Sequence, residues 1–218
     1  MSGDLAGVVL AVVLLGLNAF FVGAEFALLA ARRSQVEPRA QEGSRAARTT
    51  LRAMENVSLV MAGAQLGITS CSLGLGAIGE PAVAHLLEPL FHAARLPDDL
   101  LHPASFVVAM SIVVYLHVVL GEMVPKNIAL AGADRAAMVL SPPMMVIVTV
   151  LRPVIAVMNM IANATLRLLK IEPKDEVHSS FTREEVAALV EESRGEGLLE
   201  AEEYDLSLIH ISEPTRPY

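Results

Sequence analysis

Residues Leu5 to Ala31 read LAGVVLAVVLLGLNAFFVGAEFALLAA, and this stretch indicates what kind of protein the chain forms. A helix that rises about 1.5 Å per residue crosses the roughly 30 Å hydrocarbon core of a bilayer with about 20 apolar residues. The stretch is long enough to do so, and Glu25 is its one charged side chain. The whole chain is 54% hydrophobic and 18% charged, whereas soluble domains carry about 25% charged residues. These features predict an all-α membrane protein.

Two further uncharged runs predict a second and a third transmembrane helix, over Val57 to Gly79 and over Ala104 to Val124. The apolar segment from Ala136 to Leu169 is interrupted by Pro142-Pro143 and by Arg152-Pro153. Prolines and an arginine within a segment disfavour a clean crossing. We therefore expect three spans, and we expect this last segment to form juxtamembrane or re-entrant belt helices rather than a fourth span.

Arginine asymmetry predicts the orientation. The segment Arg32 to Arg52 is rich in arginine, which favours the cytoplasmic side. The polar segment Glu80 to Pro103 contains Arg95 as its only strong base and is predicted to be an external loop. Its histidines lack the tight spacing of a zinc site. We expect a multi-pass plasma-membrane protein whose N-terminus is outside and whose C-terminus is cytoplasmic. The first residues carry no Lys or Arg, so no signal peptide is predicted.

The second span is rich in glycine. Gly63 and Gly67 form a small-xxx-small pair, which favours close packing of two helices. The alternative is a loosened helix whose carbonyl groups line a cavity and bind a ligand.

Two carboxylates within the spans are the strongest functional signal. Placing a charged carboxylate at membrane depth costs roughly 2.5–3.5 kcal/mol, so Glu25 and Glu122 are candidate functional residues. The first and third spans run in parallel, which predicts similar depths for the two acids. Pro125 has no N–H, so we expect the carbonyl of Gly121 to be free. Oxygen ligands of this kind suit Mg²⁺ or Ca²⁺. The neutral oxygens that could complete the site belong to Asn18, Thr69, Ser70 and Ser72.

A structural alternative exists for each acid. Glu25 could pair with Arg32 two turns further on, and Glu122 could pair with Lys126 at the i, i+4 spacing. Either pair would then stabilise a helix end at the membrane interface.

Several function classes are disfavoured. The net charge of −8 gives no support for nucleic-acid binding. The single cysteine, Cys71, excludes an internal disulfide and a cysteine-rich zinc site. No nucleophile–base pairing or phosphate-binding loop is present, so an enzyme is not expected.

The C-terminal part turns soluble after Glu172-Pro173. Thr182 to Glu185 predicts a capping box that begins a short helix, and residues 172–205 together predict an acidic helical linker. Leu206 to Arg216 resembles, residue for residue, the translation of a transposase-type sequencing adapter. We therefore expect residues 206–218 to be a non-native tail.

Three stretches carry a family resemblance. They are Asn18 to Leu28 (NAFFVGAEFAL), Gln65 to Thr69 (QLGIT) and Gly121 to Lys126 (GEMVPK). In this order they resemble the signature stretches of the cyclin M transmembrane domain, the membrane module of CorB/CorC-type magnesium and cobalt efflux proteins, whose bacterial members were long labelled hemolysins. The resemblance extends from Leu5 to Asp205 and assigns residues 1–171 to the membrane domain.

The resemblance implies three spans with a cytoplasmic belt, a homodimer, and export of Mg²⁺ or Co²⁺ coupled to Na⁺. It implies ATP-Mg²⁺ binding only through a pair of CBS domains, which would follow residues 172–205 and are absent from this chain. The third-span acid corresponds to Glu122, with Gly121 and Pro125 beside it, and the first-span acid to Glu25.

Two positions depart from members with a well-defined Mg²⁺ site. Val22 stands where those members tend to have serine, and Ile68 stands where they tend to have asparagine. Two oxygen ligands are therefore missing, which favours the alternative of a non-transporting membrane sensor or scaffold. A third alternative is a membrane-damaging hemolysin, which only the historical label of the bacterial members supports.

Overall fold

The computed structural model describes residues 2–93, 97–169 and 190, and every element among them is a helix. The elements are α1 (Ser2–Ala30), α2 (Arg33–Gln41), α3 (Arg45–Glu55), α4 (Val57–Gly74), the π-helix η1 (Leu75–Gly79), α5 (Glu80–Ala93), α6 (Asp98–Leu116), the π-helix η2 (His117–Met123), α7 (Val124–Ala131) and α8 (Ala133–Leu168). Residues 1–173 form one compact unit. The predictions for the linker and the tail fall outside the described residues.

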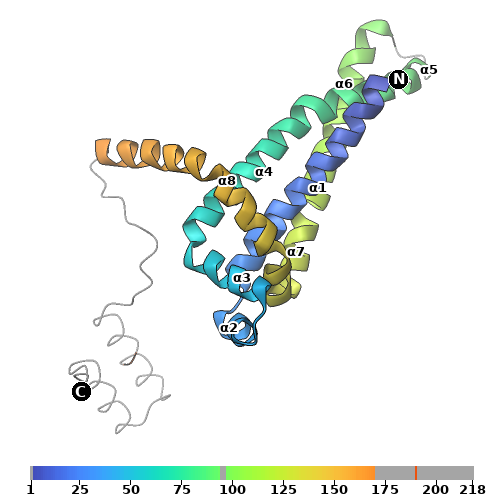
Figure 1. The fold of residues 1–218 in the computed structure, drawn as a ribbon. Helices are drawn as coiled ribbons and strands as arrows, with labels where there is room; N and C mark the ends of the chain where they lie inside the picture. The colour runs from blue at the N-terminus through green and yellow to red at the C-terminus, as the bar shows by residue number, and fades with distance from the viewer. Residues whose placement is uncertain (1, 94–96, 170–189, 191–218) are drawn as a thin grey trace, which may run out of the picture. The chain divides into compact units, whose positions relative to one another are not determined.

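The prediction of an all-α membrane protein is confirmed. Four helical stretches are long and apolar enough to cross a membrane: Leu5–Ala30, Val57–Ala93, Leu100–Ala131 and Ala133–Leu168. The first three contain the predicted spans. α1 packs along α4 and along η2 and α7, whereas α6 packs mainly against α5 (Figure 1). The fourth stretch is α8. We predicted three spans, so the described residues contain one more helix that is long and apolar enough to cross a membrane.

α8 is one continuous helix in spite of its three prolines. Its buried side chains include Met144, Val148 and Ile155, which pack against α1 and α4, whereas none of the described side chains beyond Ile155 is buried. Its first turns are bound to the α2–α3 hairpin: Thr50 donates a hydrogen bond to the carbonyl of Ala137 over 3.3 Å. α8 therefore packs over roughly its first two thirds, up to Ile155, and its start lies at the end of the bundle where α2 and α3 lie.

The stretch Glu80 to Pro103, which we predicted to be an external loop, is helical over Glu80–Ala93 and again from Asp98, and its side of the membrane stays a prediction. α5 continues directly from α4 through η1, and α6 begins at Asp98. Glu80, which we placed in the loop, is only 8% exposed. Pro81 lies two residues beyond η1, as Pro125 lies two residues beyond η2. A proline removes a backbone donor and crowds the carbonyl four residues earlier, and a single wider π-turn accommodates it without ending the helix.

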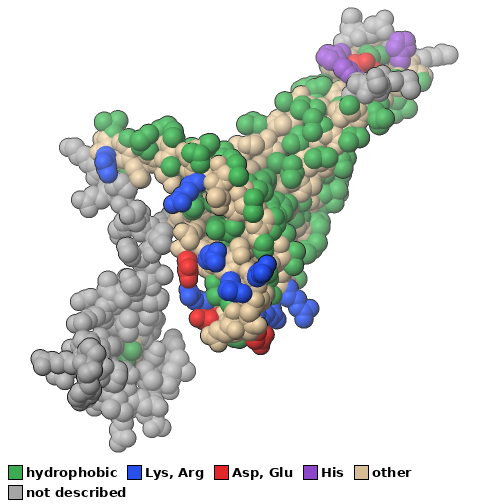
Figure 2. All heavy atoms as spheres, viewed as in Figure 1, with side chains coloured by type: hydrophobic (Ala, Val, Ile, Leu, Met, Phe, Trp, Pro, Cys, Tyr) green, Lys and Arg blue, Asp and Glu red, His purple; other side chains and the backbone are tan. Residues whose placement is uncertain are grey.

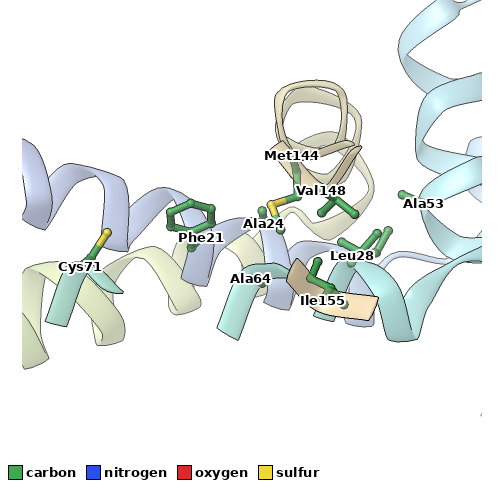
Figure 3. Packing of buried hydrophobic residues seen from close by; sticks show 10 residues of the cluster. Phe21, Ala24, Leu28, Ala53, Ala64, Cys71, Met144, Val148 and Ile155 are labelled. Carbon is green, nitrogen blue, oxygen red and sulfur yellow. The ribbon is translucent and has the colours of Figure 1, made fainter. Parts of the chain in front are cut away.

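Two glycines of α4, Gly63 and Gly67, are sites of close helix approach. A Cβ atom on Gly67 would lie 2.5 Å from the ring of Phe21 in α1, and one on Gly63 would lie 2.7 Å from Val148 in α8. Phe21 and Val148 belong to the same buried apolar cluster (Figure 3). The geometry supports the packing interpretation of this glycine pair over the ligand interpretation.

The surface is divided by chemistry. Apolar side chains cover the long bundle, Lys and Arg gather mainly at the α2–α3 end, and histidines gather at the opposite end near α5 and α6 (Figure 2). Large aliphatic side chains on the bundle surface, such as Val12, Leu73 and Val107, are more than half exposed. This is expected for surfaces that face lipid. This distribution agrees with the predicted orientation, which stays a prediction.

Candidate functional site

α1 meets the π-helix η2 at Asn18. The Asn18 side chain is fully buried, and its Nδ2 donates a hydrogen bond to the carbonyl oxygen of Gly121 over 2.9 Å. A Cβ atom on Gly121 would lie 3.0 Å from that nitrogen and 3.1 Å from Leu15, so glycine permits the approach. We predicted a free carbonyl at Gly121 because Pro125 cannot donate to it. That expectation is wrong, because Asn18 supplies the missing donor.

Sequence reasoning missed His117, which begins η2. Its Nε2 atom lies 3.0 Å from Oε1 of Glu122 and 3.3 Å from Oγ of Ser72 in α4. In an α-helix, the side chains of two residues five positions apart point in directions about 140° apart. The spacing therefore did not predict a contact between His117 and Glu122. A π-helix pairs residues i and i+5, and this register brings His117 to Glu122.

Two buried polar atoms at this junction have no hydrogen-bond partner within the part of the chain that the structure describes. They are Oδ1 of Asn18 and Nδ1 of His117. Buried polar side-chain atoms are usually hydrogen-bonded, and an exception is expected where another group binds. Both side chains lie against Gly121: the Asn18 Nδ2 and His117 Nδ1 atoms are 3.0 and 3.5 Å from the ideal Cβ position of this glycine.

The ion-pair alternatives for the two acids are contradicted. Arg32 pairs with Asp134, with 3.7 Å between the side chains and 2.9 Å from its backbone nitrogen to the carboxylate. Lys126 places its ammonium group 4.5 Å from the ring centre of Phe26. Glu25 is partly buried and has no hydrogen bond or ion pair with any other described residue. Neither acid therefore stabilises a helix end in the way that the alternative required.

The two acids do not share one level. Asn18 contacts Gly121, and Phe26 contacts Lys126 eight residues further along α1, so α1 and the α6–η2–α7 stretch run in parallel as predicted. In this register Glu25 lies roughly 5–8 Å along the helix axis from Glu122. The two acids are therefore offset by about one helical turn rather than level.

The structure brings together part of the predicted ligand set. Asn18, Gly121 and Glu122 gather at one junction, with His117 and Ser72 added. Thr69 is exposed on α4 and takes no part in these hydrogen bonds, and Ser70 bonds only within its own helix. Over the described residues, no three His, Cys, Asp or Glu side chains gather as a metal site. A cation here would be held by Glu122 and His117, with neutral oxygens completing the shell.

The two departures from the family pattern lie in packed surroundings. Val22 is 4% exposed, and Ile68 packs against the main apolar cluster. Neither side chain can contribute an oxygen to the junction.

Comparisons with known proteins agree with the architecture. The sequence model of the family described as the cyclin M transmembrane N-terminal domain matches residues 9–203. An uncharacterized protein of Mycobacterium tuberculosis is 51% identical over 200 residues, covering 92% of this chain and 57% of that protein. The UPF0053 protein YhdT of Bacillus subtilis is 36% identical over 201 residues, covering 92% of this chain and 44% of that protein.

The chain thus spans about half the length of the curated relatives that it matches. The family match covers most of the chain and includes α1, the α4–η1–α5 stretch and the α6–η2–α7 stretch. The chain belongs to the cyclin M transmembrane domain family, to which the CorB/CorC-type UPF0053 proteins belong.

Proposed function

We propose that the chain is the membrane module of a divalent-cation transporter, with Mg²⁺ or Co²⁺ as the exported ion and Na⁺ as the coupling ion. It works as a homodimer in the plasma membrane, with the N-terminus outside and the C-terminus in the cytoplasm. Glu122 is the anionic ligand, Asn18 and the second lone pair of the Gly121 carbonyl supply neutral oxygens, and Glu25 acts as a second carboxylate toward the cytoplasmic end of α1.

The junction at Glu122 carries this proposal. A carboxylate inside a predicted span directly follows Gly121, whose carbonyl accepts a hydrogen bond from Asn18, and the buried oxygen of that asparagine has no partner among the described residues. A carboxylate and an unpartnered buried oxygen are each costly in an apolar bundle, and a cation bound at this junction would lower that cost. The family membership gives independent support for ion transport.

The test is cation flux in liposomes that contain the purified chain. Glu122→Gln keeps the size of the side chain and removes its charge, so it should abolish flux while the protein stays folded. Glu25→Gln should reduce flux. Glu55→Gln is the matched control, because Glu55 is an exposed acid at the end of α3 and outside the proposed spans. Normal flux in the Glu122→Gln protein would overturn the site assignment.

A second candidate function is a non-transporting sensor or scaffold. The apolar side chains of Val22 and Ile68 favour it, because they remove two oxygen ligands from the family pattern. In this case the parent chain and the Glu122→Gln variant would both leave cation gradients across the liposome membrane intact.

A further inference from the structure

The pair formed by His117 and Glu122 has the spacing of two neighbouring metal ligands. Two donor atoms bound to one ion at about 2.1 Å, at an angle of about 90°, lie about 3.0 Å apart. Nε2 of His117 and Oε1 of Glu122 are 3.0 Å apart, and Oγ of Ser72 is 3.3 Å from the same nitrogen. The His117 side chain is 17% exposed and that of Glu122 is 46% exposed, so neither is sealed inside the bundle.

Asn18 gives an independent sign that a ligand binds at this junction. Its side chain is fully buried, and the hydrogen bond from Nδ2 to the carbonyl of Gly121 fixes which way the amide points. The atom left without a partner among the described residues is therefore the oxygen, which is an acceptor. A buried acceptor that the fold has oriented and left unpaired suits a cation or a water molecule bound to one.

The kind of donor decides the kind of ion. Mg²⁺ prefers oxygen ligands in near-octahedral geometry, whereas imidazole nitrogen suits Zn²⁺, Ni²⁺, Fe²⁺ and related transition-metal ions. This chain has an imidazole beside its intramembrane carboxylate, and it has Val22 and Ile68 where oxygen ligands would favour Mg²⁺.

We propose that His117 is a metal ligand at the Glu122 junction, and that it makes the site select a transition-metal divalent cation over Mg²⁺. The inference rests on the proposed function and narrows it to one class of cargo. Ser72 Oγ, 3.3 Å from Nε2 of His117, is the neutral oxygen that the protein adds to this pair of ligands.

His117 could instead only position the Glu122 carboxylate through a hydrogen bond. The two roles differ in one observable, because only a ligand changes the electronic spectrum of the bound metal. The probe is Co²⁺, added to the purified full chain in detergent. Its visible absorption and its X-ray absorption fine structure both report whether nitrogen is bound. Affinities for Co²⁺ and Mg²⁺ come from equilibrium dialysis.

The expected result has three parts. The parent chain binds Co²⁺ at least about 10-fold more tightly than Mg²⁺ and shows imidazole scattering. His117→Gln lowers the Co²⁺ affinity by about 10-fold or more, with a spectrum of all-oxygen coordination, and changes the Mg²⁺ affinity much less. The control His102→Gln changes neither, because His102 is an exposed histidine that also faces a glutamate, Glu88, at a distance of 3.7 Å.

Each contrary outcome has one meaning. An unchanged Co²⁺ spectrum in His117→Gln overturns the inference but leaves the proposed function standing, provided that Glu122→Gln abolishes Mg²⁺ binding. An imidazole signal that survives in Glu122→Gln belongs to another histidine and also overturns it. If the parent binds neither ion, the proposed function fails together with the inference. If His117→Gln does not fold, the X-ray absorption fine structure of Co²⁺ in the parent and in Glu122→Gln still decides whether a histidine binds the metal at this junction.

Discussion

Gly67 is the most sensitive test of how α1 and α4 pack. An alanine at this position would place its Cβ atom 2.5–2.6 Å from three atoms of the Phe21 ring. Real Cβ atoms essentially never come so close, and the ring belongs to a buried cluster and is only 7% exposed. Added volume in a packed core costs about 1–3 kcal/mol.

Gly16→Ala is the matched control. Gly16 lies within α1, and nothing lies within 4 Å of its ideal Cβ position. Replacing a helical glycine by alanine gains up to about 1 kcal/mol of helix propensity in each variant. The difference in stability between the two variants therefore isolates the clash, and it should equal the full 1–3 kcal/mol, or about 2–12 °C in midpoint for a chain of this size.

The single cysteine of the chain, Cys71, provides the assay. It is 4% exposed in the same cluster as Phe21, so a thiol-reactive fluorogenic dye added in detergent reports unfolding as the temperature rises. Gly67→Ala should react at a lower temperature than Gly16→Ala, and Phe21→Leu in the Gly67→Ala background should recover part of the loss. Equal midpoints for the two alanine variants would refute the reasoning.

Two further predictions concern orientation and the missing oxygens. Single cysteines at Glu42 and at His92, each on a Cys71→Ser background, should react differently with an impermeant thiol reagent on intact cells: His92→Cys is labelled and Glu42→Cys is protected, and the reverse pattern would invert the topology. Val22→Ser combined with Ile68→Asn should add two oxygen ligands and increase the protection that Mg²⁺ gives against thermal unfolding; an unchanged midpoint shift would mean that these positions do not face the site.

The helical framework could be predicted because hydropathy and length determine it. α1 ends within one residue of the predicted span, and α4 begins at the predicted Val57. The region from Glu80 to Pro103 could not be predicted in this way. Its prolines and charges are typical of loops, but the π-turn η1 accommodates Pro81 within a continuous helix.

The candidate site was predictable only in its composition. Glu122, Gly121 and Asn18 were identified from residue type and depth, and the structure places them at one junction. Their partners depend on how the helices face one another. The donor to Gly121 comes from a residue 103 positions earlier in the chain, and the contact between His117 and Glu122 requires a π-register that no spacing rule for α-helices contains.

The attachment of α8 to the α2–α3 hairpin has a mechanical consequence. Arg32 is held to Asp134, Thr50 to Ala137, and the guanidinium of Arg39 lies 3.6 Å from the sulfur of Met138. These ties join the start of α8 to the segment that directly follows α1. Arg32 is only about 10 Å of helix from Glu25. A force that displaces the start of α8 must therefore break these contacts or shift the end of α1. The α2–α3 hairpin thus couples the position of α8 to that of Glu25.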